Sequence, residues 1–340
     1  MKDIFNLFFS YSPRMTKIRS IVDDVARTDI AVLIKGESGT GKDLVAQAIH
    51  LKSDRHEKPF IKVNCATIPQ NLLESELFGF ERGAFTGAHR KKPGKFELAN
   101  GGTILLNDIG EVDISAQAKL LQVLQDGDFF RLGGERNISV NTRVLATTRD
   151  HLEQSMIEGR FRQDLFYRIN VVTITLPPLR DRREQIVPLS QHFLEFYKMK
   201  YGKPVHSLSL RTLGLFKNYP WPGNVIELEN TVKRIVLFGE EETIVQTLIK
   251  NSARIDARFG HDLKETDALN LKKVGRKAAE IAERKMIQTT LQETHWNRKD
   301  AARLLRISYK ALLNKIQKYR LDALEALEKN GVQKNERLRG

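Results

Sequence analysis

The amino-acid sequence predicts an α/β fold, in which a parallel sheet carries helices on both faces and is followed by all-helical segments. Apolar runs suited to buried strands occur within 29–50, 101–110 and 142–150, and helical patterns such as 115–128 lie between them. Strands that alternate with helices form parallel sheets covered on both faces. After the prolines of "TLPPLRDRR" (175–183) the pattern is helical to about residue 250, so we expect the sheet to end there.

The composition is that of an ordinary globular protein. Hydrophobic residues make up 41% and charged residues 29% of the 340 residues, which is not the composition of a disordered chain. The N-terminal apolar run "IFNLFF" is too short to span a bilayer, and no cleavage site follows it. The single cysteine, Cys65, excludes an intramolecular disulfide and suits a reducing compartment. We therefore expect a cytoplasmic protein with no membrane segment, in which Cys65 is a small buried residue.

Positive charge is concentrated at the C-terminal end. The whole chain carries a formal net charge of +14, and residues 271–340 hold 18 Lys and Arg against 8 Asp and Glu. A basic excess confined to the last part of a chain indicates a module that binds nucleic acid, although a solvated, basic helical surface has the same composition.

The segment "GESGTGK" (36–42) has the spacing of a phosphate-binding loop and lies between a predicted strand and a predicted helix. Backbone N–H groups and the helix N-terminus can hold phosphates there, and Lys42 can reach the β- and γ-phosphates. Asp43 stands where the general signature has Ser or Thr, so the usual hydroxyl ligand of magnesium is missing. The expected nucleotide-binding residues are Gly36, Glu37, Ser38, Gly39, Thr40, Gly41, Lys42 and Asp43.

Hydrolysis of a bound nucleotide also needs two carboxylates at the end of a neighbouring strand, one to hold magnesium and one to polarise the attacking water. The strand within 101–110 ends in Asn107 and Asp108. The Asn107 amide has no charge with which to hold the ion, and the Asp108 carboxylate is one methylene shorter than the expected glutamate. This strand alone is weak evidence for catalysis.

The segment "NRKDAARLLRISYKALLNKIQKYRL" (297–321) predicts two helices joined by a tight turn, with Ser308 as the N-cap of the second. The expected packing residues are Ala301, Ala302, Leu304, Leu305, Ile307, Leu312, Ile316 and Tyr319. In a helix-turn-helix the second helix enters the major groove of double-stranded DNA. The expected DNA contacts are Arg298, Ser308, Tyr309, Lys310, Asn314, Lys315 and Lys318, with the lysines on phosphates. A small packing or dimerisation helix pair is the alternative.

The segment "GAFTGA" (83–88) fits neither a helix nor a strand. Small residues surround Phe85, and basic residues flank them. The segment has too little bulk to pack as a core helix, and its glycines disfavour a strand. The pattern raises the question of what one aromatic side chain on such a loop would contact; a plain surface turn is the simplest answer.

Together these motifs resemble the sigma-54-dependent transcriptional activators, the bacterial enhancer-binding proteins of the AAA+ superfamily. The resemblance covers about residues 12 to 321 and is carried by "GESGTGKDLVAQAIH", "VNCATIPQNLLESELFGFERGAFTGA", "KFELANGGTILLNDIGE", "GRFRQDLFYRINV", "LPPLRDRREQI" and "WPGNVIELEN". It implies an α/β P-loop AAA+ core at 1–175, an all-α lid at 176–250, a linker at 251–270 and an all-α Fis-type helix-turn-helix domain at 271–340.

The resemblance implies that the loop with Gly83, Phe85, Thr86 and Gly87 contacts sigma-54 RNA polymerase, with Phe85 and Thr86 at the contact. Small neighbours would let the loop move with nucleotide state, while the aromatic ring supplies contact area. The helix at about 278–294 would pair with its symmetry mate in a dimer.

The remaining catalytic positions also follow from the resemblance. Arg162 and Arg168 resemble arginine fingers that reach the γ-phosphate of a neighbouring subunit, so catalysis would need a homo-oligomeric ring, expected to be a hexamer. Asn64 matches the asparagine that interacts with the strand-end carboxylate, here Asp108, in its switch between nucleotide states. Thr148 stands at the sensor I position, where its hydroxyl can position water.

Four positions of the ATPase motifs depart from the family pattern: Asn107-Asp108 replaces Asp-Glu, Thr148 replaces an asparagine, and Ile226 replaces the sensor II arginine. Asn107 and Asp108 are the expected site of Mg²⁺. Loss of the charge at position 107 and loss of the charge at position 226 would each lower the rate by on the order of 10²-fold or more, by analogy with the removal of other single electrostatic stabilisers. We expect slow hydrolysis rather than none.

The sequence thus predicts an activator that binds DNA upstream of promoters, binds ATP and Mg²⁺ between subunits, and remodels the closed promoter complex. One alternative is a DNA-binding regulator that uses ATP or another nucleotide only as an assembly ligand, which the residues at 107 and 226 motivate. A AAA+ ATPase that remodels some other protein would leave the hexapeptide and the helix-turn-helix unexplained.

Overall fold

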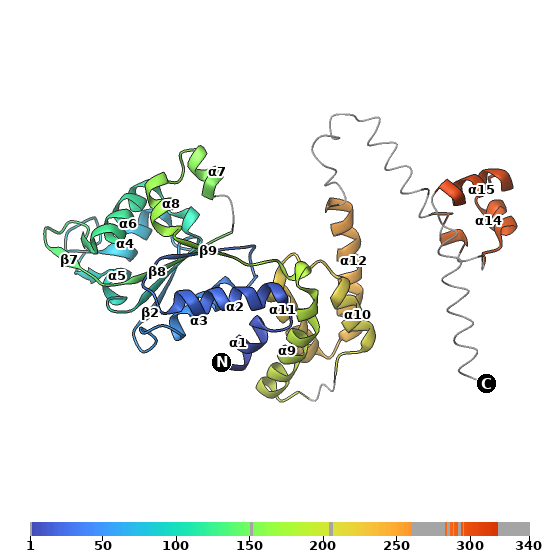
Figure 1. Ribbon diagram of the computed structural model, residues 1–340, viewed down its shortest axis with the longest axis horizontal. Coiled ribbons are helices and arrows are strands. Elements are labelled where there is room, and N and C mark those ends of the chain that lie inside the picture. The colour runs from blue at the N-terminus through green and yellow to red at the C-terminus, as the bar shows by residue number, and fades with distance from the viewer. Residues whose placement is uncertain are drawn as a thin grey trace. The chain divides into compact units, whose positions relative to one another are not determined.

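Figure 1 shows the computed structural model of the chain, which describes residues 2–149, 152–203, 207–259, 283, 286–287, 289–291, 294 and 296–318. Contacts divide the chain into two compact units, Met1–Ser252 and Ala253–Gly340. Within the described ranges, no helix is long and apolar enough to cross a membrane.

A five-stranded sheet lies at the centre of the first unit, with every pairing parallel and the strand order β2-β5-β8-β1-β9. Its strands are β1 (Val32–Lys35), β2 (Phe60–Asn64), β5 (Thr103–Asn107), β8 (Arg143–Thr148) and β9 (Val172–Thr175). The three strands predicted from apolar runs are confirmed as β1, β5 and β8. Because all strands run in one direction, their carboxyl ends meet at one edge, where ligands bind in such folds.

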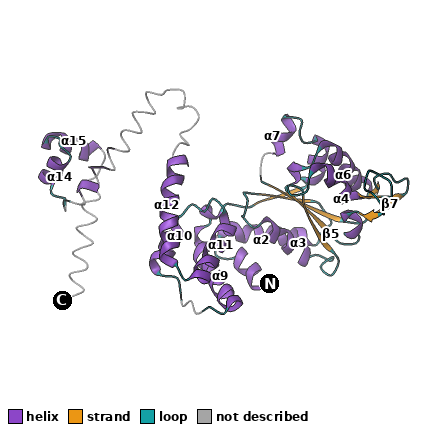
Figure 2. Ribbon diagram, turned by 180° about the vertical axis from the view of Figure 1, so that it is seen from behind, coloured by secondary structure: helices purple, strands orange, loops and turns teal. Residues whose placement is uncertain are grey.

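Alternation along the strands directs side chains into two separate cores, so the prediction of helices on both faces is confirmed (Figure 2). One face packs through Val32, Leu105 and Leu145, and the other through Leu33, Ile104 and Val144. Helices α2 (Pro13–Ala26) and α3 (Lys42–Leu51) cover the first face, and α4 (Gln70–Phe78), α6 (Ile114–Asp126) and α8 (Gln163–Ile169) cover the second. The shorter elements of this part are α1 (Lys2–Phe9), α5 (Lys95–Leu98), α7 (Leu152–Ile157), the hairpin of β3 (Gly79–Phe80) and β4 (Lys92–Pro93), and the hairpin of β6 (Asp128–Phe130) and β7 (Asn137–Ser139).

The region after residue 175 is helical, as predicted. It contains α9 (Ile186–Tyr201), α10 (Leu210–Asn218), α11 (Asn224–Phe238) and α12 (Glu241–Phe259). Helix α12 runs into the range expected to be a linker, and its buried residues Ile244, Val245 and Leu248 lie before that range. The rest of that range, 260–270, lies outside the described residues.

The second unit contains α14 (Arg298–Leu304) and α15 (Tyr309–Lys318), the predicted helix-turn-helix. Its core consists of Ile287, Leu291, Ala301, Ala302, Leu312 and Ile316, with Leu305 and Ile307 partly buried against it. The expectation for Leu304 is wrong, since its side chain is 64% exposed and Ile287 and Leu291 fill the core instead. Tyr319 lies outside the described residues, as does most of the helix expected at 278–294.

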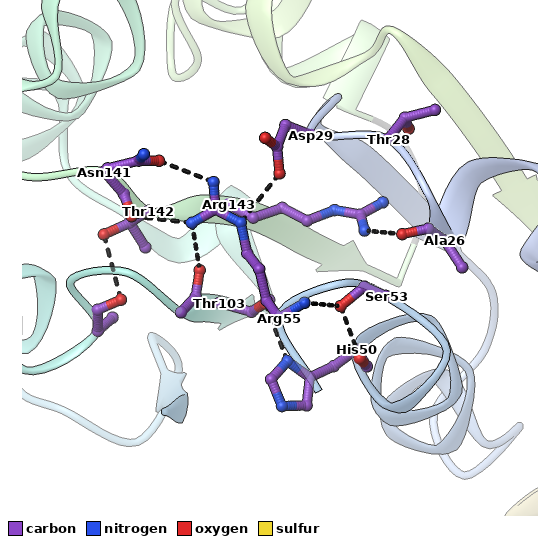
Figure 3. Close-up of polar contacts among 12 residues, drawn as sticks. Ala26, Thr28, Asp29, His50, Ser53, Arg55, Thr103, Asn141, Thr142 and Arg143 are labelled. Carbon is purple, nitrogen blue, oxygen red and sulfur yellow. Dashed lines mark hydrogen bonds and ion pairs between the residues drawn. The ribbon is translucent and has the colours of Figure 1, made fainter. Parts of the chain in front are cut away.

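Two arginines lie at the amino ends of the strands, on the side of the sheet opposite the nucleotide-binding edge. The buried Arg143 guanidinium donates to the carbonyl oxygens of Val25 and Ala26, at the end of α2, at 2.7 and 2.8 Å. Arg55 lies beside it and donates to Asp29 and Asn141 (Figure 3). Burial lowers the pKa of Arg143 to about 10, so the side chain is still charged at neutral pH.

The same cluster contains a buried histidine that should make stability depend on pH. His50 stacks on Phe60, and its Nδ1 lies 3.0 Å from the Thr103 hydroxyl. Burial lowers its pKa below the ordinary value of 6.5. Below about pH 6.5 the unfolded chain therefore takes up a proton that the folded chain does not. The free energy of unfolding falls as the pH is lowered, until the pKa of His50 in the folded chain is reached.

We expect His50→Gln to reduce this loss between pH 7.5 and about 5.5 in urea unfolding. The exposed His89 provides the control, and His89→Gln should leave the pH dependence unchanged. If His50→Gln and the unaltered chain lose the same stability between these pH values, groups other than His50 cause the pH dependence.

Candidate functional site

The phosphate-binding loop leads from β1 into α3 at the carboxyl edge of the sheet. Two of its glycines are required by close packing. A Cβ on Gly39 would lie 2.3 Å from the carbonyl oxygen of Gly223, and a Cβ on Gly41 would lie 2.5 Å from the Phe8 ring. Both residues also have positive φ, 77° and 100°, which disfavours any residue with a side chain.

Charged contacts fix this loop to the lid. The Lys42 ammonium donates to the carbonyl oxygens of Gly36 and Glu37 at 2.6 and 3.0 Å. The Glu37 carboxylate accepts two hydrogen bonds from Arg180, at 2.8 and 2.5 Å, and one from Asn224 at 3.1 Å. The Arg180 hydrogen bond lowers the pKa of Glu37. Because Asn224 begins α11, loop and lid are held together.

A fully buried arginine, Arg182, is hydrogen-bonded to the phosphate-binding loop. The Arg182 guanidinium donates to the carbonyl oxygen of Thr40 at 2.6 Å and lies 5.1 Å from the centre of the Phe8 ring. Gln185 donates to the carbonyl oxygens of Phe8 and Ser10. These contacts bring the end of α1 to the nucleotide loop.

Asn107, at the end of β5, is paired with the acidic residue that follows the loop lysine. Its amide nitrogen donates to Asp43 Oδ1 at 3.0 Å, and its oxygen accepts from the Thr147 hydroxyl at 3.2 Å. Among the described residues, no cluster of three or more His, Cys, Asp or Glu side chains could hold a metal ion. The Asp43 carboxylate still fits Mg²⁺ that binds together with nucleotide phosphates, since Mg²⁺ usually takes one or two carboxylates plus phosphate oxygens.

Asp108 has left-handed backbone geometry, with φ of 53°. Its N–H donates to the Thr147 hydroxyl at 3.1 Å, and its carboxylate lies 3.2 Å from the Arg149 guanidinium. Asn64 uses its side-chain oxygen to accept from the Ala66 N–H. No hydrogen bond joins Asn64 to Asp108 in the described parts of the chain, so their contact remains a prediction about nucleotide states.

A pocket of about 920 Å³ lies at this edge, between the loop, the strand ends and the lid. Its apolar side suits a base and its polar side suits phosphates. The apolar side is formed by Phe8, Leu189, Phe193 and Phe196, and the polar side includes Ser38, Lys42, Asp43, Asn64, Asn107, Asp108, Thr147 and Arg149.

Two departures from the family pattern can be placed against this pocket. Ile226 lines it, 55% exposed, and brings no charge. Thr148 is buried and is not among the lining residues. Alternation along β8 directs Thr147 and Arg149 toward the pocket instead.

The two predicted arginine fingers make contacts within their own chain. Arg162, at the N-terminus of α8, forms an ion pair with Asp164 at 2.7 Å. Arg168 donates twice to the carbonyl oxygen of Leu124, near the end of α6, at 2.9 and 2.8 Å. Both roles in a ring remain predictions, and each would require exchange of these contacts for a neighbour's phosphate.

The "GAFTGA" segment forms a closed loop between β3 and β4. A hydrogen bond from the Gly83 N–H to the Ala88 carbonyl oxygen closes it at 2.9 Å. Gly83 and Gly87 have φ of 86° and 103°. Phe85 is 41% exposed and packs edge-on against Phe80, with ring centres 4.9 Å apart. The loop therefore presents an accessible aromatic side chain.

The second helix of the helix-turn-helix presents a polar outer side. Tyr309, Lys310, Asn314 and Lys318 are exposed. Ser308 caps α15 by accepting from the Ala311 N–H at 3.2 Å, as predicted. Arg298 is half-buried at the start of α14, and Lys315 forms an ion pair with Glu283. The turn residue Arg306 has φ of 53°, a conformation that favours glycine.

Several residues of the site were missed by sequence reasoning. Thr147 and Arg149 were adjacent to the residue chosen at sensor I, and alternation along β8 was the signal that separates them. Arg180 and Arg182 lie within the motif "LPPLRDRREQI", which carries no indication of their partners.

A parallel sheet of this strand order, a phosphate-binding loop after β1 and a helical lid define an AAA+ P-loop nucleotide-binding protein. Residues 8–175 match the sigma-54 interaction domain, 180–264 the AAA+ ATPase lid domain, and 278–319 the bacterial regulatory protein, Fis family. The chain belongs to the family of sigma-54-dependent transcriptional activators.

The chain is similar to curated proteins over most of its length. It is 42% identical to the regulatory protein AtoC of Escherichia coli over 313 residues, covering 92% of this chain and 67% of AtoC. It is 42% identical to the Nif-specific regulatory protein of Klebsiella pneumoniae, covering 90% of this chain and 57% of that protein. The chain thus spans little more than half the length of some relatives.

Among solved structures, the chain is similar to NtrX of Brucella abortus in complex with ATP. The TM-score is 0.67 at 30% identity, over 92% of this chain and 69% of NtrX.

Proposed function

We propose that the chain activates transcription from promoters occupied by sigma-54 RNA polymerase, using ATP bound between the subunits of a ring. A phosphate-binding loop with its pocket, an exposed "GAFTGA" loop and a helix-turn-helix occur together in one chain. A protein that only bound DNA would need neither of the first two. The site of action is the cytoplasm, on DNA upstream of promoters.

In this proposal the parts follow the predicted boundaries: a nucleotide-binding core at 1–175, a lid at 176–250 and a DNA-binding domain at 271–340. Fis-type domains would pair on two-fold related sites. The ring, proposed to be a hexamer, would present the Phe85 and Thr86 side chains to the polymerase.

The residues of the pocket would divide the work of hydrolysis. Lys42 would hold the β- and γ-phosphates, while Asp108 would orient the attacking water and accept its proton. Arg162 and Arg168 of a neighbouring subunit would stabilise charge on the transferred phosphoryl group. Asp43, with Asn107 beside it, would hold Mg²⁺, whose charge assists phosphoryl transfer.

The pairing of Asn107 with Asp43 favours a second candidate. With an amide at the metal position and no charge at Ile226, the chain would bind nucleotide as an assembly ligand and hydrolyse it little or not at all. Both candidates bind nucleotide and DNA, and they differ in turnover.

Steady-state release of phosphate from Mg-ATP separates the two candidates. The measurement uses the whole chain over a protein concentration series, with Lys42→Ala as the blank. We expect slow turnover that disappears in the blank and rises more than linearly with protein, because sites shared between subunits form only on assembly. Turnover no higher than the blank at any concentration would favour the assembly-ligand candidate.

A further inference from the structure

The pocket contains an ion pair that none of the roles above uses. Arg149 follows the last residue of β8, and its guanidinium lies 3.2 Å from Asp108 Oδ2. The two side chains differ in accessibility, since that of Arg149 is 62% exposed and that of Asp108 only 17%. Asp108 is thus held in place by the hydrogen bond from its N–H to the Thr147 hydroxyl and by an exposed arginine that lines the pocket.

Arg149 is one of two strongly basic side chains that line this pocket in the described part of the chain; the other is Lys42. At the position where the family pattern has its phosphate-sensing arginine, Ile226 presents an apolar side chain. A triphosphate in the pocket would therefore find the second basic side chain of the same chain at the end of β8. A guanidinium suits that contact, because its planar set of donors matches phosphate oxygens.

We propose that Arg149 is the phosphate-sensing residue of this site. It exchanges Asp108 for the terminal phosphate when a nucleoside triphosphate binds, and thereby releases the carboxylate. The inference rests on the proposed function, since it concerns the same nucleotide pocket. Arg149 acts on Asp108 by positioning it and on the nucleotide by direct contact.

The energetics permit this exchange. An ion pair between a well-exposed arginine and a carboxylate is weak in water. A terminal phosphate carries more charge than a carboxylate and forms stronger, charge-assisted hydrogen bonds with arginine. A nucleoside diphosphate lacks the γ-phosphate, so Arg149 would remain paired with Asp108 when a diphosphate is bound. The ion pair would therefore distinguish ATP from ADP.

The geometry of Asp108 also explains why arginine serves here. Within the described ranges no hydrogen bond joins the predicted partner, Asn64, to Asp108, whereas Arg149 contacts it. The Asp108 side chain is short and cannot extend far from the strand end. Arg149 has a long side chain and starts from the adjacent strand, so it can reach both Asp108 and the pocket.

Equilibrium binding of fluorescent N-methylanthraniloyl nucleotides tests the proposal without hydrolysis or transcription. The probes are a non-hydrolysable triphosphate analogue and the diphosphate, with the whole chain. We expect Arg149→Gln to weaken the triphosphate analogue by about tenfold or more, the value of one charge-assisted hydrogen bond, and to leave the diphosphate within about twofold. Arg211→Gln is the control, because Arg211 is 63% exposed, pairs with Glu242 and lies in α10 outside the pocket.

A double-mutant cycle tests the competition itself. Asp108→Asn should tighten binding of the triphosphate analogue, because it frees Arg149, and this gain should vanish when Arg149→Gln is present. A gain that persists in the double variant would show that the ion pair does not compete with phosphate.

The outcomes separate this inference from the proposed function. If the unaltered chain binds both probes and Arg149→Gln leaves their affinity ratio unchanged, the sensing role is wrong and the proposed function stands. If the unaltered chain binds neither probe, the proposed function fails, and the sensing role fails with it. Matching thermal unfolding of Arg149→Gln and the unaltered chain confirms that any difference arises in the pocket.

Discussion

Thr86→Ala is expected to abolish promoter opening by sigma-54 RNA polymerase while DNA binding and nucleotide binding stay unchanged. Thr86 is exposed at the tip of the loop between β3 and β4, and its hydroxyl makes no hydrogen bond within the described ranges. The closing bond from Gly83 to Ala88 uses backbone atoms only. The substitution therefore removes a contact without disturbing the loop.

The expected loss in open-complex formation is at least about 30-fold, the effect of removing a side chain central to an interface. Thr86 is a sharper test than Phe85, since the Phe85 ring also packs on Phe80 and its removal would change the loop itself. Thr243→Ala is the matched control, an exposed threonine on α12. Normal promoter opening by Thr86→Ala, with an inactive Lys42→Ala in the same assay, would remove the loop tip from the mechanism.

The fold could be predicted from local patterns wherever a short segment determines its own structure. The phosphate-binding loop needs glycines at positive φ, and its strand and helix are contiguous in sequence. The helix-turn-helix was recognisable from Ser308 and the spacing of Leu312 and Ile316. Leu304 was wrongly predicted to be buried, because the spacing of apolar residues along a helix does not show which neighbouring element covers them. Here Ile287 and Leu291 cover the other side.

The supporting contacts of the site could not be predicted, because each joins segments far apart in the chain. Arg182 donates to Thr40 across 142 positions. The ion pair between Arg149 and Asp108 forms because β5 and β8 are adjacent strands in the sheet. Sequence spacing alone does not show which strands lie side by side.

Asn107→Asp is expected to raise the rate of ATP hydrolysis by about 10²-fold or more at saturating Mg²⁺, by analogy with the value of single electrostatic stabilisers in other active sites. In the structure the Asn107 amide donates to Asp43 at 3.0 Å. An aspartate there would place two carboxylates side by side. Without a cation they repel each other, and with Mg²⁺ both can serve it.

The rate gain should therefore appear together with a lower Mg²⁺ requirement. Measuring turnover across a Mg²⁺ series at saturating ATP reports both quantities. The charge-conserving variant Asp43→Asn/Asn107→Asp moves the single carboxylate from α3 to β5 and tests which position matters. If it matches Asn107→Asp, the strand position alone suffices, and if it falls back to the level of the unaltered chain, both carboxylates are needed.

No increase in either variant at any Mg²⁺ concentration would mean that the metal position does not limit the rate. The next departure to test is Ile226, whose exposed side chain lines the pocket. Ile226→Arg would then be expected to raise turnover, because an arginine at that position can contact the phosphates without displacing any buried group. If Arg149 already senses the terminal phosphate, the gain from Ile226→Arg should be larger in the Arg149→Gln background than in the unaltered chain, since two arginines directed at one phosphate would be partly redundant.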